Sequence, residues 1–94
     1  MTEQPINTLS WNVRGLNSPA RKRAVKQKIE ESQCLVVYLQ ETKCDFFDQT
    51  SIRKFCPKRF DNFVYSPSVG ASGGIIILWC SSALVGSLID LQSY

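Results

Sequence analysis

The sequence predicts an α/β fold in which helices pack outside buried sheets. Two apolar runs, residues 34–39 and 74–79, are rich in β-branched and aromatic residues and have the length of buried strands. A basic segment with a thin apolar stripe, residues 18–32, separates the first of these runs from an earlier strand-like segment. The expected order of elements is β-α-β-α-β-β-β, which is typical of an α/β sandwich.

The first strand is expected within residues 6–13, where apolar side chains alternate. The first helix should begin after Ser18, because serine is a good N-cap and Pro19 at the first helical position loses only an amide without a helical partner. It should end near Glu31 or Ser32. Its apolar stripe consists of Ala20, Ala24, Val25 and Ile29, and its basic residues are Arg21, Lys22, Arg23, Lys26 and Lys28.

The second strand, residues 34–39, is a continuous apolar run, so it should be buried on both faces. A short helix is expected within residues 45–55, with Asp48 as its cap and with Ile52 and Phe55 facing inward. The later elements are separated by turn residues. They are a strand at 63–65, a loop at 66–73, the strongest strand at 74–79 and a final strand near 84–91.

Composition limits the class of protein. The chain has 94 residues, enough for at most one small domain, and its hydrophobic content of 44% indicates a globular chain. It shows neither a secretory signal nor an apolar run long enough for a membrane span, so we expect an intracellular protein, cytoplasmic or nuclear, that is not secreted. A net charge of +3 permits a polyanionic partner without requiring one.

The four cysteines are widely spaced, and the chain has no histidine. Structural zinc sites need closely spaced pairs of ligands, so this spacing argues strongly against a zinc site. Reduced thiols are the expectation inside the cell. Cys34 and Cys80 lie in apolar runs and should be small core residues.

Asn12 and Glu41 are the candidate site residues, because each follows an apolar strand segment. Ligands gather at the carboxyl ends of strands in α/β folds, and a carboxylate there is well placed for a hard cation. Each residue also has a simpler interpretation. Asn12 could be a turn former, and Glu41 could begin a solvated loop and pair with Lys43. The two residues together favour a metal site.

Residues 10–17 (SWNVRGLN) and 39–43 (LQETK) resemble the opening of the endonuclease/exonuclease/phosphatase superfamily. More narrowly, residues 11–19 (WNVRGLNSP), the QETK segment and residues 71–75 (ASGGI) are similar to the endonuclease domain of plant LINE-type non-LTR retrotransposons. The resemblance covers almost the whole chain. It implies that residues 6–94 form the N-terminal portion of a four-layer, DNase I-like α/β sandwich, truncated at its C-terminal side, with residues 1–5 as a flexible N-terminus.

The resemblance also implies roles for individual residues. Glu41 corresponds to the family's Mg²⁺-binding glutamate, and Asn12 to the asparagine that helps to hold the metal and to orient the catalytic carboxylate. The implied cofactor is therefore Mg²⁺, and the implied partners are DNA and the missing C-terminal part of the same domain, with no membrane. The candidate nucleic-acid-binding residues are Arg14, Lys43, Ser72 and Gly73.

The departures from the family pattern lead to an expectation of inactivity. The family's later motifs supply further carboxylates and a histidine, and this chain has no histidine. Mg²⁺ should bind weakly to one glutamate and one carboxamide, because it keeps its waters unless several oxygens replace them. We therefore expect the N-terminal part of a Mg²⁺-dependent DNA-nicking phosphodiesterase without turnover of its own. The alternatives are a retroelement relic or weak nucleic-acid-binding fragment, and a fragment of a small-molecule phosphatase of the same superfamily.

Three other features have two interpretations each. The glycine-rich loop at residues 70–74 could admit a nucleic-acid backbone or could be an ordinary turn. The basic face of the first helix could follow phosphates or could simply be solvated. Trp11 and Trp79 could stack on bases, but their apolar surroundings favour core packing.

Overall fold

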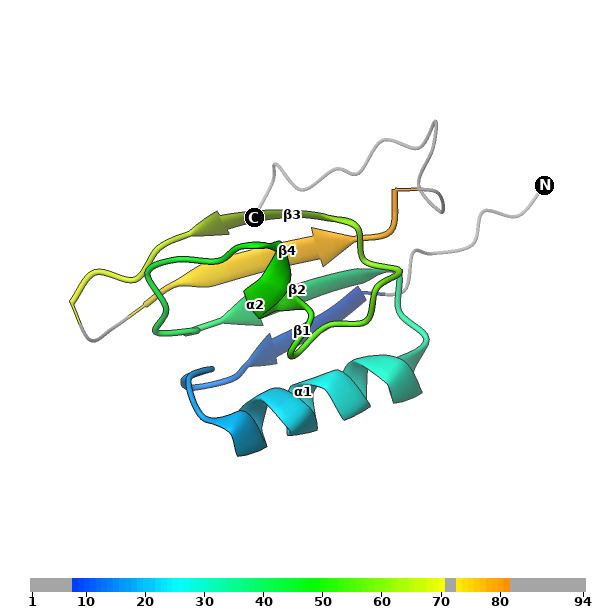
Figure 1. The fold of residues 1–94 in the computed structure, drawn as a ribbon, viewed down its shortest axis with the longest axis horizontal. Helices are drawn as coiled ribbons and strands as arrows, with labels where there is room; N and C mark the ends of the chain where they lie inside the picture. Colours follow the sequence, from blue (N-terminus) through cyan, green and yellow to red (C-terminus); the bar gives the residue numbers. More distant parts are fainter. Residues whose placement is uncertain (1–7, 71–72, 82–94) are drawn as a thin grey trace.

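The computed structural model describes residues 8–70 and 73–81, and within them one mixed sheet and two helices (Figure 1). The elements follow one another as β1 (Thr8–Asn12), α1 (Pro19–Ser32), β2 (Val36–Gln40), α2 (Gln49–Ile52), β3 (Asn62–Ser66) and β4 (Ile75–Trp79). The expected order is confirmed through the fourth strand. The final strand expected near 84–91 lies outside the described residues.

The sheet has the strand order β1-β2-β4-β3. β1 pairs with β2 in parallel, with Asn12 opposite Gln40, and α1 forms the crossover between these two strands. β4 lies antiparallel between β2 and β3, with Gln40 opposite Ile75. Because of this arrangement, the carboxyl ends of β1 and β2 meet the beginning of β4 at one edge of the sheet.

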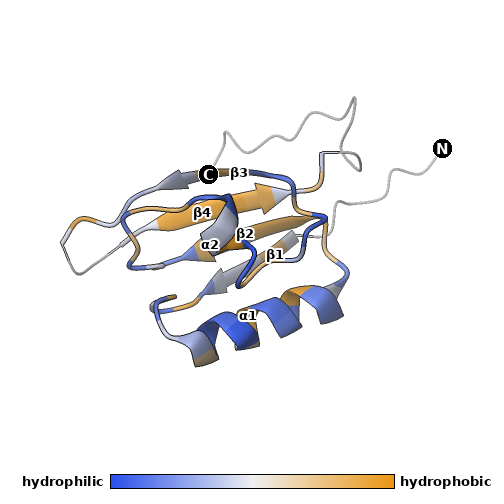
Figure 2. Ribbon diagram, in the orientation of Figure 1, coloured by the Kyte–Doolittle hydropathy of each residue, from blue (hydrophilic) through white to orange (hydrophobic). Residues whose placement is uncertain are grey.

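The hydrophobic core lies on one face of the sheet, between the strands and the two helices. Val37 and Leu39 of β2 are paired with Leu78 and Ile76 of β4, and all four side chains are fully buried. The helices and their connections supply the other side of the core. Its residues there are Val25, Ile29, Phe47, Ile52, Phe55, Cys56 and Phe60. Figure 2 shows the corresponding hydrophobic colouring of β2 and β4 against a mainly hydrophilic α1.

The opposite face of the sheet carries uncharged side chains from β2, β4 and β3. Tyr38 and Ile77 are half-buried there, and Val64, opposite Ile77, is 53% exposed. Trp79 lies on this face as well, because it alternates with the core residue Leu78. The expectation of core packing is confirmed for Trp11, which packs against the core cluster. Trp79 is half-buried on the opposite face, where it pairs with the buried Val36.

The expected burial of residues 34–39 is confirmed in part, because Leu35 and Tyr38 are only half-buried while the other four residues are buried. Val36 and Val37 point to opposite faces of the sheet, and both are buried. Cys34 and Cys80 are 2% and 4% exposed and belong to the core cluster. The core also contains Cys56, and burial raises the pKa of its thiol to about 12.

Helix α1 begins and ends as its sequence predicts. The Ser18 hydroxyl accepts a hydrogen bond from the Arg21 amide at 3.1 Å. The helix ends where Gln33 adopts a left-handed conformation, with φ of 56°. The apolar stripe is narrower than expected: Val25 and Ile29 are buried, but Ala20 and Ala24 are exposed. Within the described residues, no helix is long and apolar enough to cross a membrane.

Asp48 caps helix α2, and we expect it to make the stability of the fold depend on pH. The Asp48 carboxylate accepts the Ser51 amide at 2.8 Å, and this backbone hydrogen bond, together with the Ser51 hydroxyl, lowers the Asp48 pKa. A carboxyl group with a lowered pKa stabilises the folded state above its unfolded pKa, and this contribution is lost as the pH falls through the folded value. Asp48→Asn keeps a good cap and removes the titration.

We therefore expect wild-type stability to decline more steeply than that of Asp48→Asn as the pH falls below about 4. Urea unfolding at a series of pH values measures this difference. Asp45→Asn is the matched control, because Asp45 is an exposed aspartate of the preceding loop that does not cap the helix. Parallel pH profiles for wild type and Asp48→Asn would contradict the prediction.

Candidate functional site

The structure brings the two predicted site residues into direct contact. The Asn12 side-chain nitrogen, Nδ2, donates a hydrogen bond to Glu41 Oε2 at 2.7 Å, and both residues are exposed. The contact follows from the parallel pairing, because Asn12 ends β1 opposite Gln40, and Glu41 is the next residue along the chain. A carboxamide and a carboxylate therefore lie together at the edge where strands β1 and β2 end.

Backbone hydrogen bonds continue past the strand ends and hold this edge together on the β1 side. The Val13 amide donates to Gln40 O at 3.0 Å, and the Gly15 amide donates to Glu41 O at 2.7 Å. The carbonyl of Glu41 is therefore tied to the segment after Asn12. Both side chains of the pair project from backbone that is fixed on each side.

The same edge is tied to the segment before β4. The Thr42 amide donates to Gly74 O at 3.0 Å, and the Lys43 amide donates to Gly73 O at 2.9 Å. Thr42 is fully buried, although it is polar, and its hydroxyl accepts the Cys44 amide at 3.3 Å. The three chain segments at this edge therefore form one continuous hydrogen-bonded unit.

Left-handed backbone conformations gather at this edge. Arg14, Glu41 and Lys43 have φ values of 54°, 55° and 58°, and the neighbouring Gly15, Gly73 and Gly74 are also at positive φ. Side-chain-bearing residues rarely adopt this region, and it costs about 1–3 kcal/mol per residue. Such strain persists where surrounding structure imposes it, and it clusters at functional sites. The backbone strain therefore marks this edge as a candidate functional site independently of the side-chain chemistry.

Three of the four candidate nucleic-acid-binding residues lie at the edge, and Ser72 lies outside the described residues. Arg14 and Lys43 are exposed. The Lys43 stem passes over Gly15, since a Cβ built on that glycine would lie 3.7 Å from Lys43 Cδ. Gly73 is bonded to Lys43 through its carbonyl. Two cationic side chains and an exposed glycine backbone therefore flank the Asn12–Glu41 pair.

Sequence reasoning missed Asn17 and Thr42, which position this edge. Asn17 Nδ2 donates to Lys43 O at 3.2 Å, and Asn17 Oδ1 accepts the Cys44 thiol at 3.3 Å. The only sequence signal was the position of Asn17 after a glycine-containing turn, where asparagine commonly bonds to backbone. Nothing in the residue type of Thr42 indicates that it is fully buried.

The Asn12–Glu41 pair meets part of what Mg²⁺ requires. Carboxylate and amide oxygens are the hard donors that this ion prefers, and the carboxamide uses its nitrogen in the pair, so Asn12 Oδ1 can bind a cation. Within residues 8–70 and 73–81, however, no three or more His, Cys, Asp or Glu side chains form a group that could hold a metal. The pair would supply only part of the ligands of a Mg²⁺ ion, and water would have to supply the rest.

Comparisons with known proteins place the fold. No family model matches the sequence, and no curated protein matches it. Among solved structures, the chain is similar to the AP endonuclease LMAP from Leishmania major, with a TM-score of 0.58 and 22% sequence identity. The similarity covers 85% of this chain and 25% of that protein, so the chain spans about a quarter of its length.

The chain thus has the fold of part of a DNase I-like protein, and the predicted fold class is confirmed. The described residues supply one sheet and the helices on one of its faces. At this level of identity the likeness establishes the fold. It assigns no role to the Asn12–Glu41 edge.

Proposed function

We propose that this chain supplies the metal-binding edge of a Mg²⁺-dependent phosphodiesterase that nicks DNA, of the type found in plant LINE-type retrotransposons. The observation that carries the proposal is the 2.7 Å contact between Asn12 Nδ2 and Glu41 Oε2 at the ends of two parallel strands. The fold likeness to an AP endonuclease supports a nuclease, and the resemblance of residues 11–19 to retroelement endonucleases favours DNA.

In this proposal Glu41 and Asn12 Oδ1 hold the cation, and the Asn12 amide orients the carboxylate. Bound Mg²⁺ would neutralise the negative charge that builds on phosphoryl oxygens during hydrolysis. Arg14 and Lys43 would attract the DNA backbone, and Gly73 would let it approach without a side chain in the way. None of these groups is a histidine or an aspartate that could move a proton. We therefore propose that the 94 residues bind without turnover.

The test combines DNA binding with nicking. We expect Mg²⁺ to strengthen binding of the chain to a short DNA duplex compared with EDTA, because the cation bridges carboxylate and phosphate. Glu41→Gln should lower Mg²⁺ affinity about tenfold, since losing one charge on an exposed site is worth about 1–2 kcal/mol. Glu30→Gln, an exposed glutamate on α1, is the matched control.

Fluorescence anisotropy at fixed ionic strength measures the binding, and relaxation of a supercoiled plasmid measures nicking. Equal binding in Mg²⁺ and EDTA, or an unchanged Mg²⁺ response in Glu41→Gln, would contradict the metal site. Robust nicking that EDTA abolishes would contradict the proposed lack of turnover.

A second candidate is a weak nucleic-acid-binding fragment that uses the basic face of α1. The observation in its favour is a surface hollow of about 340 Å³ lined by Lys22, Arg23, Lys54 and Pro19. Three cations around one hollow attract phosphates by releasing counterions. Replacing Arg21, Lys22 and Arg23 with serine should abolish retention on DNA at low salt, while Glu41→Gln should leave it unchanged in EDTA. Retention by the triple variant would exclude this surface.

A further inference from the structure

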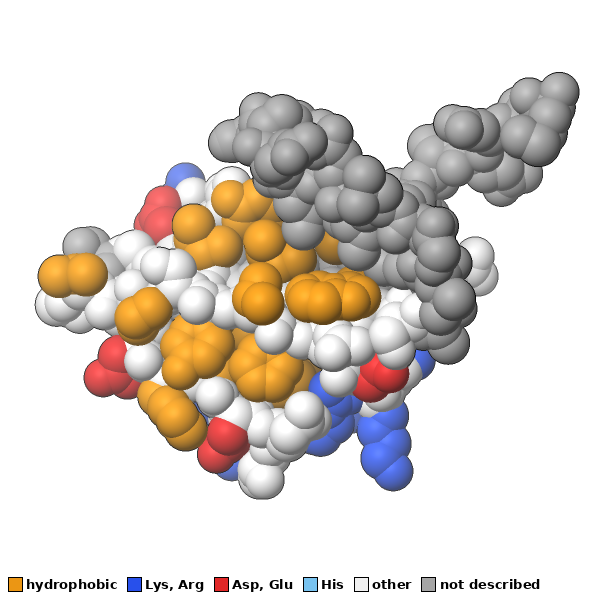
Figure 3. Space-filling view, turned by 90° about the horizontal axis from the view of Figure 1, so that it is seen from above, with side chains coloured by type: hydrophobic (Ala, Val, Ile, Leu, Met, Phe, Trp, Pro, Cys, Tyr) orange, Lys and Arg blue, Asp and Glu red, His pale blue; other side chains and the backbone are white. Residues whose placement is uncertain are grey.

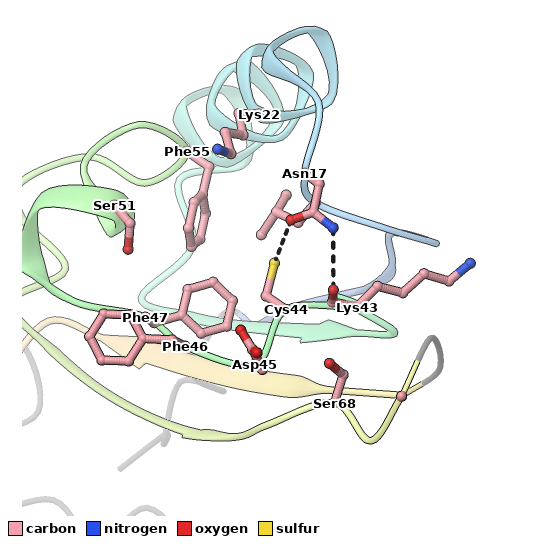
Figure 4. A pocket seen from close by; sticks show the side chains of 12 residues that line it. Asn17, Lys22, Lys43, Cys44, Asp45, Phe46, Phe47, Ser51, Phe55 and Ser68 are labelled. Carbon is pink, nitrogen blue, oxygen red and sulfur yellow. Dashed lines mark hydrogen bonds between the residues drawn. The ribbon is translucent and has the colours of Figure 1, made fainter.

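A cavity of about 370 Å³ lies beside the Asn12–Glu41 edge, and its size is in the range of small-molecule sites. It opens between the beginning of α1, the loop after β2 and the loop after β3 (Figure 4). Lys43 lines the cavity and also flanks the candidate metal site. A ligand that extends from that site along the loop after β2 would therefore enter the cavity.

The Asn17 side chain connects the segments that form the wall between the cavity and the Asn12–Glu41 edge. Asn17 bonds Lys43 O through its amide nitrogen and the Cys44 thiol through its oxygen, as Figure 4 shows. The thiol points toward Asn17 at the cavity surface. Burial raises the Cys44 pKa, so the thiol stays neutral and keeps donating this hydrogen bond. The cavity wall is therefore preformed, because these hydrogen bonds need no ligand.

The cavity has an aromatic floor and an aromatic rim. Phe47 and Phe55 are 5% and 1% exposed and pack edge to face with ring centroids 5.8 Å apart. Phe46, which directly precedes Phe47 in the sequence, is 63% exposed. Figure 3 shows the hydrophobic side chains that lie open on the β3 side of the molecule. An exposed phenyl ring beside a cavity is a surface on which a planar group can stack.

Lys22 supplies a positive charge at the α1 side of the cavity. Lys22 reaches from α1 to the space above Phe55, and Asp45 is the one carboxylate that lines the cavity (Figure 4). Lys43 lines the cavity as well, but its ammonium group points away from it (Figure 4). Lys22 lies close enough to the Cys44 sulfur to oppose the rise in its pKa, which places the ammonium at the cavity. A ligand that fits both features combines a phosphate with a planar aromatic body.

We propose that this cavity binds one unpaired nucleotide of a DNA strand, with its base on Phe46 and its phosphate beside Lys22. The inference rests on the proposed function for the choice of DNA and adds a second, metal-independent subsite to it. Base stacking on an aromatic side chain tolerates any base, so the subsite would hold a strand next to the cleavage edge without reading its sequence.

The probe is a fluorescein-labelled single strand of eight deoxythymidines, added to the whole chain in EDTA. We expect Phe46→Ala to weaken binding about tenfold, which is the usual loss for one stacked base, and Phe46→Trp to retain it. Val64→Ala is the matched control, because Val64 is also an exposed apolar side chain but lies on the far face of the sheet. It should bind as wild type does.

Lys22→Gln tests the phosphate contact, and it should reduce the slope of log affinity against log salt by about one. A competition with inorganic phosphate separates a phosphate site from a nucleotide site: we expect deoxyadenosine monophosphate to displace the strand at concentrations where phosphate does not. Equal displacement by phosphate, or wild-type affinity of Phe46→Ala, would overturn the proposal.

The two proposals fail separately. Glu41→Gln should leave binding of the single strand in EDTA unchanged, because no metal is involved. If Phe46→Ala binds the single strand as wild type does while Mg²⁺ still strengthens duplex binding, the nucleotide subsite is overturned and the metal site stands. If Phe46→Ala weakens single-strand binding while Mg²⁺ has no effect on duplex binding, the subsite stands and the metal site is overturned.

Discussion

Gly74→Ala should destabilise the chain by about 3 kcal/mol and displace the edge that carries Glu41. Gly74 has a φ of +96°, a conformation that side-chain-bearing residues rarely adopt. A Cβ there would overlap Thr42 Oγ1 and lie 3.2 Å from the Lys43 amide nitrogen. Thr42 is fully buried, so it cannot move away cheaply. The free-energy costs of overpacking and of backbone strain together give the expected loss of about 3 kcal/mol.

Urea unfolding gives the loss of stability, and the amide resonances of Thr42 and Lys43 report the displacement of the edge. Gly70→Ala is the matched control, because Gly70 is at φ of +65° with no atom within 4 Å of a built Cβ. It should cost only the backbone strain, about 1 kcal/mol. Equal losses in the two variants would show that the Gly74–Thr42 contact does not constrain the edge.

Phe55→Ala should cost about 3–5 kcal/mol, the range for removing a buried aromatic side chain. Phe55 is 1% exposed, stacks edge to face on Phe47 and forms the floor beneath the cavity. At this size the loss approaches the whole stability of a small domain. We therefore expect Phe55→Ala to be largely unfolded, as judged by loss of near-ultraviolet circular dichroism.

Phe46→Ala is the control for this prediction, since Phe46 also lines the cavity but is 63% exposed. It should change stability by about 0.5 kcal/mol or less. A folded Phe55→Ala, or an unfolded Phe46→Ala, would show that burial is assigned to the wrong ring. The outcome also decides whether Phe46→Ala is a fair probe of nucleotide binding.

The local structure could be predicted from the sequence because its signals are local. The Ser18-Pro19 start of α1 and the Asp48 cap of α2 depend on a few neighbouring atoms, and the structure has both. The apolar run at residues 34–39 required a buried strand, and β2 lies within one or two residues of it. The apolar stripe of α1 was overestimated because alanine packs or faces solvent at little cost.

The meeting of Asn12 and Glu41 was predictable once their strands were taken to be parallel neighbours, since parallel strands end at the same edge. The insertion of β4 between β2 and β3 was not, because strand order depends on long-range pairing. Nor could the left-handed backbone at Glu41 and Lys43 be foreseen, as these residue types rarely adopt it. Two tertiary hydrogen bonds hold this conformation: the Gly15 amide donates to Glu41 O, and the Lys43 amide donates to Gly73 O.

Substoichiometric Mn²⁺, added to ¹⁵N-labelled chain as a paramagnetic stand-in for Mg²⁺, tests the Asn12–Glu41 site most directly. The ion broadens amide resonances near its binding site first. We predict that residues 12–15, 41–43 and 73–74 lose intensity before the rest of the described chain, and that Glu41→Gln removes this pattern. Broadening centred on other carboxylates, such as Asp61 or Glu30, with an unchanged pattern in Glu41→Gln, would contradict the account.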